Sequence, residues 1–204
     1  MGQRSQIYFR VNRKDGTKFI VGRYFQWNYG TRMISRARGL LEWLQRMSDY
    51  PESLFSYDSE KIPRIMEVNF DYKDVVLSRD IVADCKNPDY GWTLLFNDDN
   101  NDGKLMVDMI VDYATSDKKG NYPVTIKYAF TDWDNSSPMN GEEYMQWDTD
   151  YGDAEDSTPW REDEYIKKEI KYTERNIKKI DKIAKLMTQD ELEEYINYDY
   201  SKEN

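Results

Sequence analysis

The alternation of apolar and polar residues predicts a β-hairpin early in the chain. Residues 7–11 and 19–25 are rich in β-branched and aromatic side chains, which favour strands. The segment between them contains Asp15-Gly16, a pair typical of tight turns because glycine adopts the left-handed backbone conformation easily. We therefore expect an antiparallel hairpin over residues 6–26.

A helical spacing of apolar residues follows this hairpin. Thr31 suits the N-cap position, because its hydroxyl can accept a hydrogen bond from a backbone N–H of the first turn. Over about residues 32–48 the apolar side chains recur at every third or fourth position, which predicts a helix with one buried face. Pro51 then ends the helix. The residues of the buried face are Ile34, Ala37, Leu41, Leu44 and Met47.

The middle of the chain carries both strand and helix signals. Residues 71–86 fit either element, and the spacing of Val75, Arg79 and Val82 favours a helix. The other predicted elements are a short helix over 61–69, a second hairpin formed by 92–96 and 105–111, a strand over 124–130 and a short helix over 140–147. Together they predict an α+β fold, in which an antiparallel sheet built from two hairpins plus a further strand packs with helices.

A heptad pattern marks the last part of the chain. Seven residues follow one another at alternating steps of four and three, which predicts a long helix over about 160–187. Thr188 and Glu191 have the spacing of a capping box and predict a final helix through Tyr198. We expect an α+β core domain over 1–150, an acidic linker over 151–159 and a helical C-terminal appendage over 160–204. The heptad residues are Ile166, Ile170, Thr173, Ile177, Ile180, Ala184 and Met187.

The sequence allows two interpretations of the heptad seam. It can pack against its own chain, or it can form a homodimer or a partner-docking surface through the C-terminal helix.

Composition narrows the classes of function. Aromatic residues make up 15% of the chain, which predicts a folded protein, and no apolar run approaches the ~20 residues that cross a bilayer. Cys85 is the only cysteine, so an internal disulfide is impossible and a reducing cytoplasm is expected. The chain has no histidine, which excludes Ser-His-Asp and Cys-His nucleophiles and histidine-ligated zinc. We predict no catalytic residues and favour a non-enzymatic protein.

Charge is distributed unevenly along the chain. Residues 1–47 hold ten of the 29 basic residues and two of the 39 acidic ones, so the remaining 157 residues hold 19 and 37. A basic head on an acidic body is typical of a protein that acts by binding through its surface. The alternative is that the basic head packs against the acidic body of the same chain.

The segment before the first predicted helix is a candidate anion site. Trp27, Asn28 and Tyr29 precede the helix start, where unpaired N–H groups attract negative charge. Arg32 and Arg36 are four positions apart on one helix face and would repel each other mildly without an anion between them. These five residues predict a site for a phosphate, a nucleotide or a nucleic-acid backbone.

An acidic loop offers a candidate metal site. Asp98, Asn100 and Asp102, followed by Gly103, match the first half of a calcium-binding loop. The second half departs from that pattern, because Met109 stands where the bidentate glutamate belongs. The alternative is a plain hairpin turn with exposed carboxylates, so the chain has either no cofactor or a divalent cation such as Ca²⁺ here.

A run of carboxylates is the candidate partner-binding surface. Dense carboxylates beside aromatic residues can imitate a phosphate backbone and occupy a nucleic-acid-binding groove on another protein. With a net charge of −10, the chain itself is not expected to bind nucleic acid directly. The candidate residues are Asp148, Asp150, Asp153, Glu155 and Asp156.

Several motifs spread over residues 1–148 resemble those of a known group of proteins. They are MGQRSQIY (1–8), QWNYG (26–30), RMISRAR (32–38), DNNDGK (99–104), KYAF (127–130) and YMQWD (144–148). On these motifs, residues 1–148 are similar to small uncharacterised proteins of phages and prophages from Gram-positive bacteria. The resemblance implies a phage-encoded accessory protein of the host bacterial cytoplasm that inhibits host defence, in the manner of an anti-CRISPR protein. Alternative functions are a nucleotide- or phosphate-binding protein, a carboxylate- or metal-dependent enzyme, or a virion-associated protein.

Overall fold

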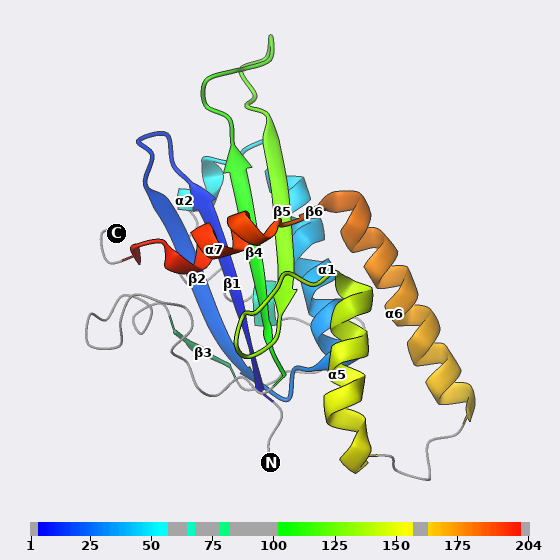
Figure 1. The fold of residues 1–204 in the computed structure, drawn as a ribbon. Helices are drawn as coiled ribbons and strands as arrows, with labels where there is room; N and C mark the ends of the chain where they lie inside the picture. The colour runs from blue at the N-terminus through cyan, green and yellow to red at the C-terminus, as the bar shows by residue number, and fades with distance from the viewer. Residues whose placement is uncertain (1–3, 57–64, 68–77, 82–101, 157–162, 201–204) are drawn as a thin grey trace.

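A mixed β-sheet with helices on both faces forms the centre of the computed structural model (Figure 1). The structure describes residues 4–56, 65–67, 78–81, 102–156 and 163–200. Within them the sheet has six strands in the order β3-β2-β1-β4-β5-β6. The strands are β1 Arg4–Asn12, β2 Lys18–Gln26, β3 Ser78–Asp80, β4 Lys104–Val111, β5 Val124–Thr131 and β6 Lys185–Leu186.

Two antiparallel hairpins supply the four long strands. The predicted β1–β2 hairpin is confirmed, with Arg4 opposite Gln26 and Asn12 opposite Lys18. The second hairpin joins β4 to β5 through a loop that extends beyond the sheet (Figure 1). Residues 92–96, which we predicted to pair with β4, lie outside the described part of the chain.

The two hairpins meet through a parallel pair of strands at the centre of the sheet. β1 and β4 run parallel, with Ile7 beside Leu105 and Phe9 beside Val107, and β5 and β6 are also parallel. The α+β class is confirmed, whereas the prediction of a wholly antiparallel sheet is wrong. The reason is that β4 has β1 on one side and β5 on the other, so the hairpins associate by a long-range contact.

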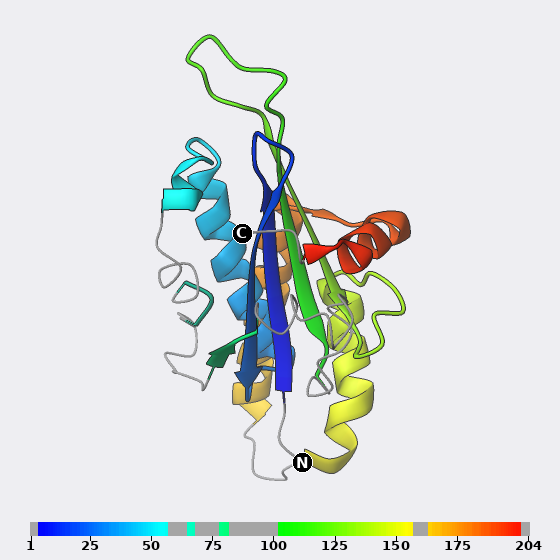
Figure 2. The ribbon, with the colours of Figure 1, turned by 90° about the vertical axis from the view of Figure 1, so that its left-hand side faces the viewer.

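Two apolar layers cover the sheet, one on each face. Because side chains alternate along a strand, Ile7 and Phe9 join one cluster with α1, α5 and α6, while Tyr8 joins a second cluster with α7. Figure 1 shows α7 crossing the strands on the near face and α1 behind them, and Figure 2 shows the sheet from its side. The helices are α1 Gly30–Met47, α2 Ser53–Ser56, α5 Gly141–Asp156, α6 Asp163–Ile183 and α7 Gln189–Asn197.

The C-terminal heptad seam packs largely inside the chain. Ile177 and Ile180 are 5% and 0% exposed and belong to the cluster on the α1 side of the sheet. Met187 belongs to the cluster on the other face. Ile170 belongs to the same predicted seam, but it is 53% exposed and lines a groove between α5 and α6. A homodimer through the buried part of this seam therefore has no apolar surface available to it.

Several local predictions are confirmed or corrected by the helix boundaries. Thr188 and Glu191 form the predicted capping box at the start of α7. The N-cap of α1 is Tyr29, two residues before the predicted N-cap Thr31, and the helix begins at Gly30. Residues 78–80 are a strand rather than the favoured helix, because they pair with the edge of β2, and residues 65–67 of the predicted short helix are helical.

The expected acidic linker is also different in the structure. The helix predicted over 140–147 continues to Asp156 as α5. The acidic stretch before residue 157 is therefore helical, while residues 157–159 lie outside the described part.

Candidate functional site

The N-terminus of α1 is held against a carboxylate of the same chain. Gly30, its first residue, has a positive φ of 44°. A Cβ atom placed on Gly30 would lie 2.6 Å from Oδ2 of Asp148 in α5, so a larger residue would strain the backbone and displace this carboxylate. The sequence predicted an anion at the start of this helix, and the carboxylate of Asp148, a predicted partner-binding residue, supplies that negative charge.

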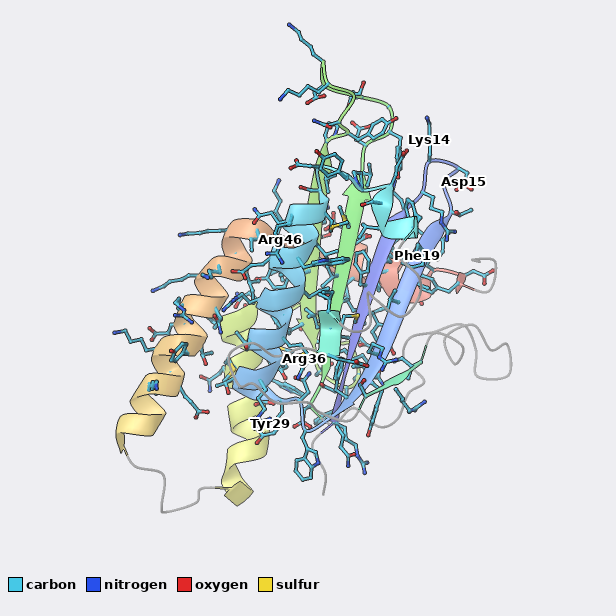
Figure 3. The ribbon with its side chains drawn as sticks, turned by 180° about the vertical axis from the view of Figure 1, so that it is seen from behind. Lys14, Asp15, Phe19, Tyr29, Arg36 and Arg46 are labelled. Carbon is cyan, nitrogen blue, oxygen red and sulfur yellow. The ribbon has the colours of Figure 1, made fainter. Side chains whose placement is uncertain are left out.

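Arg36 of the predicted anion site is a buried structural residue. Its side chain is 1% exposed, and Nε donates a 3.0 Å hydrogen bond to Oδ1 of Asn28. Its Nη1 donates to the backbone carbonyls of Met66, at 2.9 Å, and Glu67. Figure 3 shows Arg36 on α1. These carbonyl and amide oxygens take the place of the predicted anion.

The rest of the predicted anion site does not converge on one exposed point. Asn28 is fully buried and donates to Oγ of Ser5 at 2.9 Å. Arg32 and Tyr29 are partly buried. Trp27 is half exposed with a positive φ of 62°, an uncommon conformation for a bulky residue that turns the chain from β2 towards α1. Because Arg36 points into the fold, the phosphate-ligand hypothesis loses the exposed arginine pair on which it depended.

Asp102 of the predicted metal loop is buried against the start of β1. Its carboxylate accepts a hydrogen bond from the backbone N–H of Arg4, and its own N–H donates to the carbonyl of Arg4 at 2.9 Å. Burial raises the pKa of Asp102 to about 6 because the charged form loses hydration. Asp98 and Asn100 lie outside the described residues. The calcium site remains a prediction, since no group of three or more metal-ligating side chains occurs among the residues that the structure describes.

Tyr144 links the predicted sites to one another. It is fully buried on α5, and its hydroxyl donates to the backbone carbonyl of Asp102 at 2.9 Å. Burial raises the pKa of Tyr144, and the carboxylates of Asp148 and Asp102 raise it further, while a hydrogen bond from the backbone of Gly30 opposes the rise. The sequence placed Tyr144 on a short helix, but no local signal indicated that it joins α1, α5 and the acidic loop.

A buried lysine fixes the acidic turn that follows β5. Lys104 is fully buried, and its Nζ donates to the carbonyl of Trp133 and to Oδ1 of Asn135, both at 3.0 Å. The Trp133 ring lies 5.7 Å from the ring of Trp147 in α5. The turn after β5 therefore packs against α5, and we call the two together the frame. Asp134 is exposed on it.

This frame belongs to a segment of the sequence that contains no basic residue. Between Lys127 and Arg161 the sequence contains nine carboxylates and no basic residue, and we call residues 128–160 the acidic segment. Asp134, Glu142 and Glu143 are exposed, whereas Asp148 is partly buried beside α1. The other predicted partner-binding residues lie on the second half of α5, and their side chains are outside the described part: Asp150, Asp153, Glu155 and Asp156.

The arginines of the basic head mostly stabilise the fold. Arg10 is 1% exposed, donates to Asp108 at 2.8 Å and to the hydroxyl of Tyr200 at 3.2 Å, and stacks over the Tyr195 ring. Arg23 pairs with Glu67, and Arg38 pairs with Glu42 at 3.1 Å. Arg10 and Arg23 thus pair with carboxylates of the acidic body, as the alternative interpretation of the basic head expected, whereas the partner of Arg38 belongs to the head itself.

Comparison of the chain with models of protein families, with curated proteins and with solved structures found no match. The resemblance to phage and prophage proteins therefore stays a prediction. In the described residues, no helix combines the length and the apolar character needed to cross a bilayer.

Proposed function

We propose that this protein is a non-enzymatic inhibitor whose acidic segment occupies a cationic groove on a partner that handles nucleic acid. The observation that carries the proposal is the run of nine carboxylates without a basic residue between Lys127 and Arg161. Its exposed members Asp134, Glu142 and Glu143 are supported by the buried Lys104 and by α5. A rigid array of carboxylates lowers the entropy lost on binding a cationic groove.

The electrostatics of α5 support this proposal. The last turn of α5 contains no basic residue, although cations at a helix C-terminus are favourable and carboxylates there cost about 0.3–1 kcal/mol each. The 16 residues of α5 span roughly 24 Å at 1.5 Å per residue. A cationic partner would offset the unfavourable charge along that length, so binding such a partner would be electrostatically favourable for α5.

The resemblance supplies the biological setting of the proposal. A phage-encoded accessory protein in the host bacterial cytoplasm would meet host defence complexes, whose nucleic-acid grooves are cationic. We therefore propose a defence effector that binds nucleic acid, such as a CRISPR nuclease, as the partner class.

The test is competition with nucleic acid for a captured partner. The tagged protein is used to capture partners from a host lysate, the partner is purified, and displacement of its labelled nucleic acid is titrated. An α5 variant replaces four carboxylates with their amides, and a matched control replaces four exposed carboxylates on other elements. The α5 set is Asp150→Asn, Asp153→Asn, Glu155→Gln and Asp156→Asn; the control set is Asp49→Asn, Glu52→Gln, Asp190→Asn and Glu193→Gln.

The proposal predicts a clear difference between these variants. The α5 variant should displace nucleic acid about tenfold less well, a loss of about 1.4 kcal/mol, and the control should match the parent. Affinity should also fall as salt rises to 0.5 M, where screening shortens electrostatic reach to roughly 4–5 Å. Equal displacement by all three proteins, or a partner with no affinity for nucleic acid, would refute the proposal.

A further inference from the structure

Helix α6 has a basic side opposite its buried seam. Five basic residues recur at steps of three and four from position 168 to position 182, and all five are exposed. The buried residues Thr173, Ile177 and Ile180 lie on the other side of the helix, because 3.6 residues complete a turn. Figure 3 shows side chains that end in nitrogen projecting from α6 away from the rest of the molecule. We call this set the cationic face: Lys168, Lys171, Arg175, Lys178 and Lys182.

The lysines of the cationic face are not neutralised within the described part of the chain. No ion pair there joins a carboxylate to Lys168, Lys171, Lys178 or Lys182. Lys179, by contrast, lies towards α1 and pairs with Glu42 at 3.2 Å. Like charges at these helical spacings repel one another. Binding of an external polyanion would reduce this repulsion.

The nearest acidic residues do not remove this charge. Asp181 accepts a 2.7 Å hydrogen bond from the hydroxyl of Tyr128 on β5, which holds its carboxylate towards the sheet. Glu174 is the one acidic residue among the described residues that line the groove along the face. Over residues 168–185, seven basic side chains outnumber three acidic ones, in a chain whose overall charge is −10.

The same surface carries an aromatic platform. Tyr172 is 39% exposed, and the guanidinium of Arg175 lies 4.5 Å from its ring centroid. Both residues line a groove of about 680 Å³ together with Lys168, Lys171 and Lys178. An exposed ring beside cationic groups is the arrangement on which unpaired nucleobases stack.

We propose that the cationic face of α6 binds the phosphate backbone of a nucleic acid. The 14 steps from Lys168 to Lys182 span roughly 21 Å at 1.5 Å per residue, so the charges form a straight row that suits a regular polyanion. Four of the five residues are lysines, which bind phosphates as point charges but are depleted at the cores of protein interfaces. A membrane surface fits less well, since the five residues of the cationic face are charged and insertion needs several apolar groups.

The net charge of the chain does not oppose this binding. At 0.15 M salt a charge acts over about 8 Å, so the local row of lysines decides the contact rather than the total of −10. The expectation that the chain does not bind nucleic acid directly came from that total. The inference is independent of the proposed function, because it concerns α6 and not the acidic segment.

Binding is tested with labelled 20-residue oligonucleotides in fluorescence anisotropy. Single-stranded RNA, single-stranded DNA and duplex DNA are titrated separately between 50 and 300 mM salt. The test variant is Lys171→Gln, Lys178→Gln and Lys182→Gln together, and the matched control is Lys14→Gln, Lys118→Gln and Lys119→Gln, which are exposed on two other loops. Thermal melting checks that each variant is folded, which we expect because the described residues form no ion pair with the replaced α6 lysines.

The parent should bind at least one of the oligonucleotides with a dissociation constant of about 10⁻⁶–10⁻⁴ M at physiological salt. The α6 variant should bind about 100-fold more weakly at 0.1 M salt, with a salt slope less steep by about one unit per lysine. The control should match the parent. Tyr172→Ala should weaken single-strand binding about fivefold or more and leave the duplex nearly unchanged, if bases stack there.

Three outcomes would overturn the inference. The first is an absence of salt-dependent binding to all three oligonucleotides. The second is equal loss of affinity in the α6 variant and its control. The third is binding to poly-L-glutamate at the affinity found for the oligonucleotides, which would assign the face to acidic proteins.

Discussion

Replacing Asp102 with asparagine tests whether a buried carboxylate weakens the fold at neutral pH. Burial raises its pKa from the ordinary 3.8 to about 6, so between pH 4 and pH 6 the folded protein keeps a proton that the unfolded chain has released. The folded state binds more protons in this range, and stability therefore falls as pH rises. A shift of about two pKa units corresponds to about 3 kcal/mol, at 1.36 kcal/mol per unit.

Asparagine removes this titration but keeps an acceptor for the backbone N–H of Arg4. Asp102→Asn should therefore equal the parent to within about 1 kcal/mol at pH 4 and exceed it by up to about 3 kcal/mol at pH 7. Urea unfolding of both proteins at half-unit pH intervals gives the difference directly, since the other carboxylates are common to both. Asp134→Asn, at an exposed carboxylate, is the matched control and should show no such trend.

The reasoning about Asp102 would be refuted by a difference that does not change with pH. It would also be refuted if the parent gained stability relative to Asp102→Asn between pH 4 and pH 6. That result would mean that the folded state favours the charged carboxylate.

Four further substitutions test the packing. Ile177→Asp should lower the free energy of unfolding by several kcal/mol, because it buries an unpaired charge. Ile170→Asp, at a 53% exposed site, should change the free energy of unfolding by less than about 0.5 kcal/mol. Light scattering should give the mass of the parent for both variants. Gly30→Ala should cost about 1–2 kcal/mol in urea unfolding through its positive φ, with an added clash against Asp148. Arg10→Met should cost about 3–5 kcal/mol by the same measurement, since it leaves a buried carboxylate without its partner; a loss below 1 kcal/mol in either case would contradict the assigned contacts.

Local patterns predicted the elements whose signals are complete within a few residues. The first hairpin followed from Asp15-Gly16, and α7 followed from the spacing of Thr188 and Glu191. The buried side of α1 followed from its period of three and four. In each of these cases the residues that decide the structure also touch one another.

Contacts between distant segments could not be predicted in this way. The parallel pairing of β1 with β4 joins residues about 98 positions apart, and no periodicity encodes which strands meet. Arg36 gave the same local signal as an exposed arginine, although its partners at Met66 and Glu67 bury it. The cationic face of α6, by contrast, was present in the sequence at the same spacing as the apolar seam.

Because the chain is synthesised from its N-terminus, Arg10 is made long before some of its partners. Its partners Glu194 and Tyr200 follow it by 184 and 190 residues, so at 5–20 residues per second a ribosome needs roughly 10–40 s to supply them. β4, which carries Met106 and the Arg10 partner Asp108, is made about halfway through that interval. In the second half, the face of the sheet that carries Tyr8 and Met106 has no helix α7 to cover it. We expect the charged pair of Arg10 and Asp108, in the middle of that uncovered face, to oppose pairing with other nascent chains, as inward-pointing charges do on natural sheets.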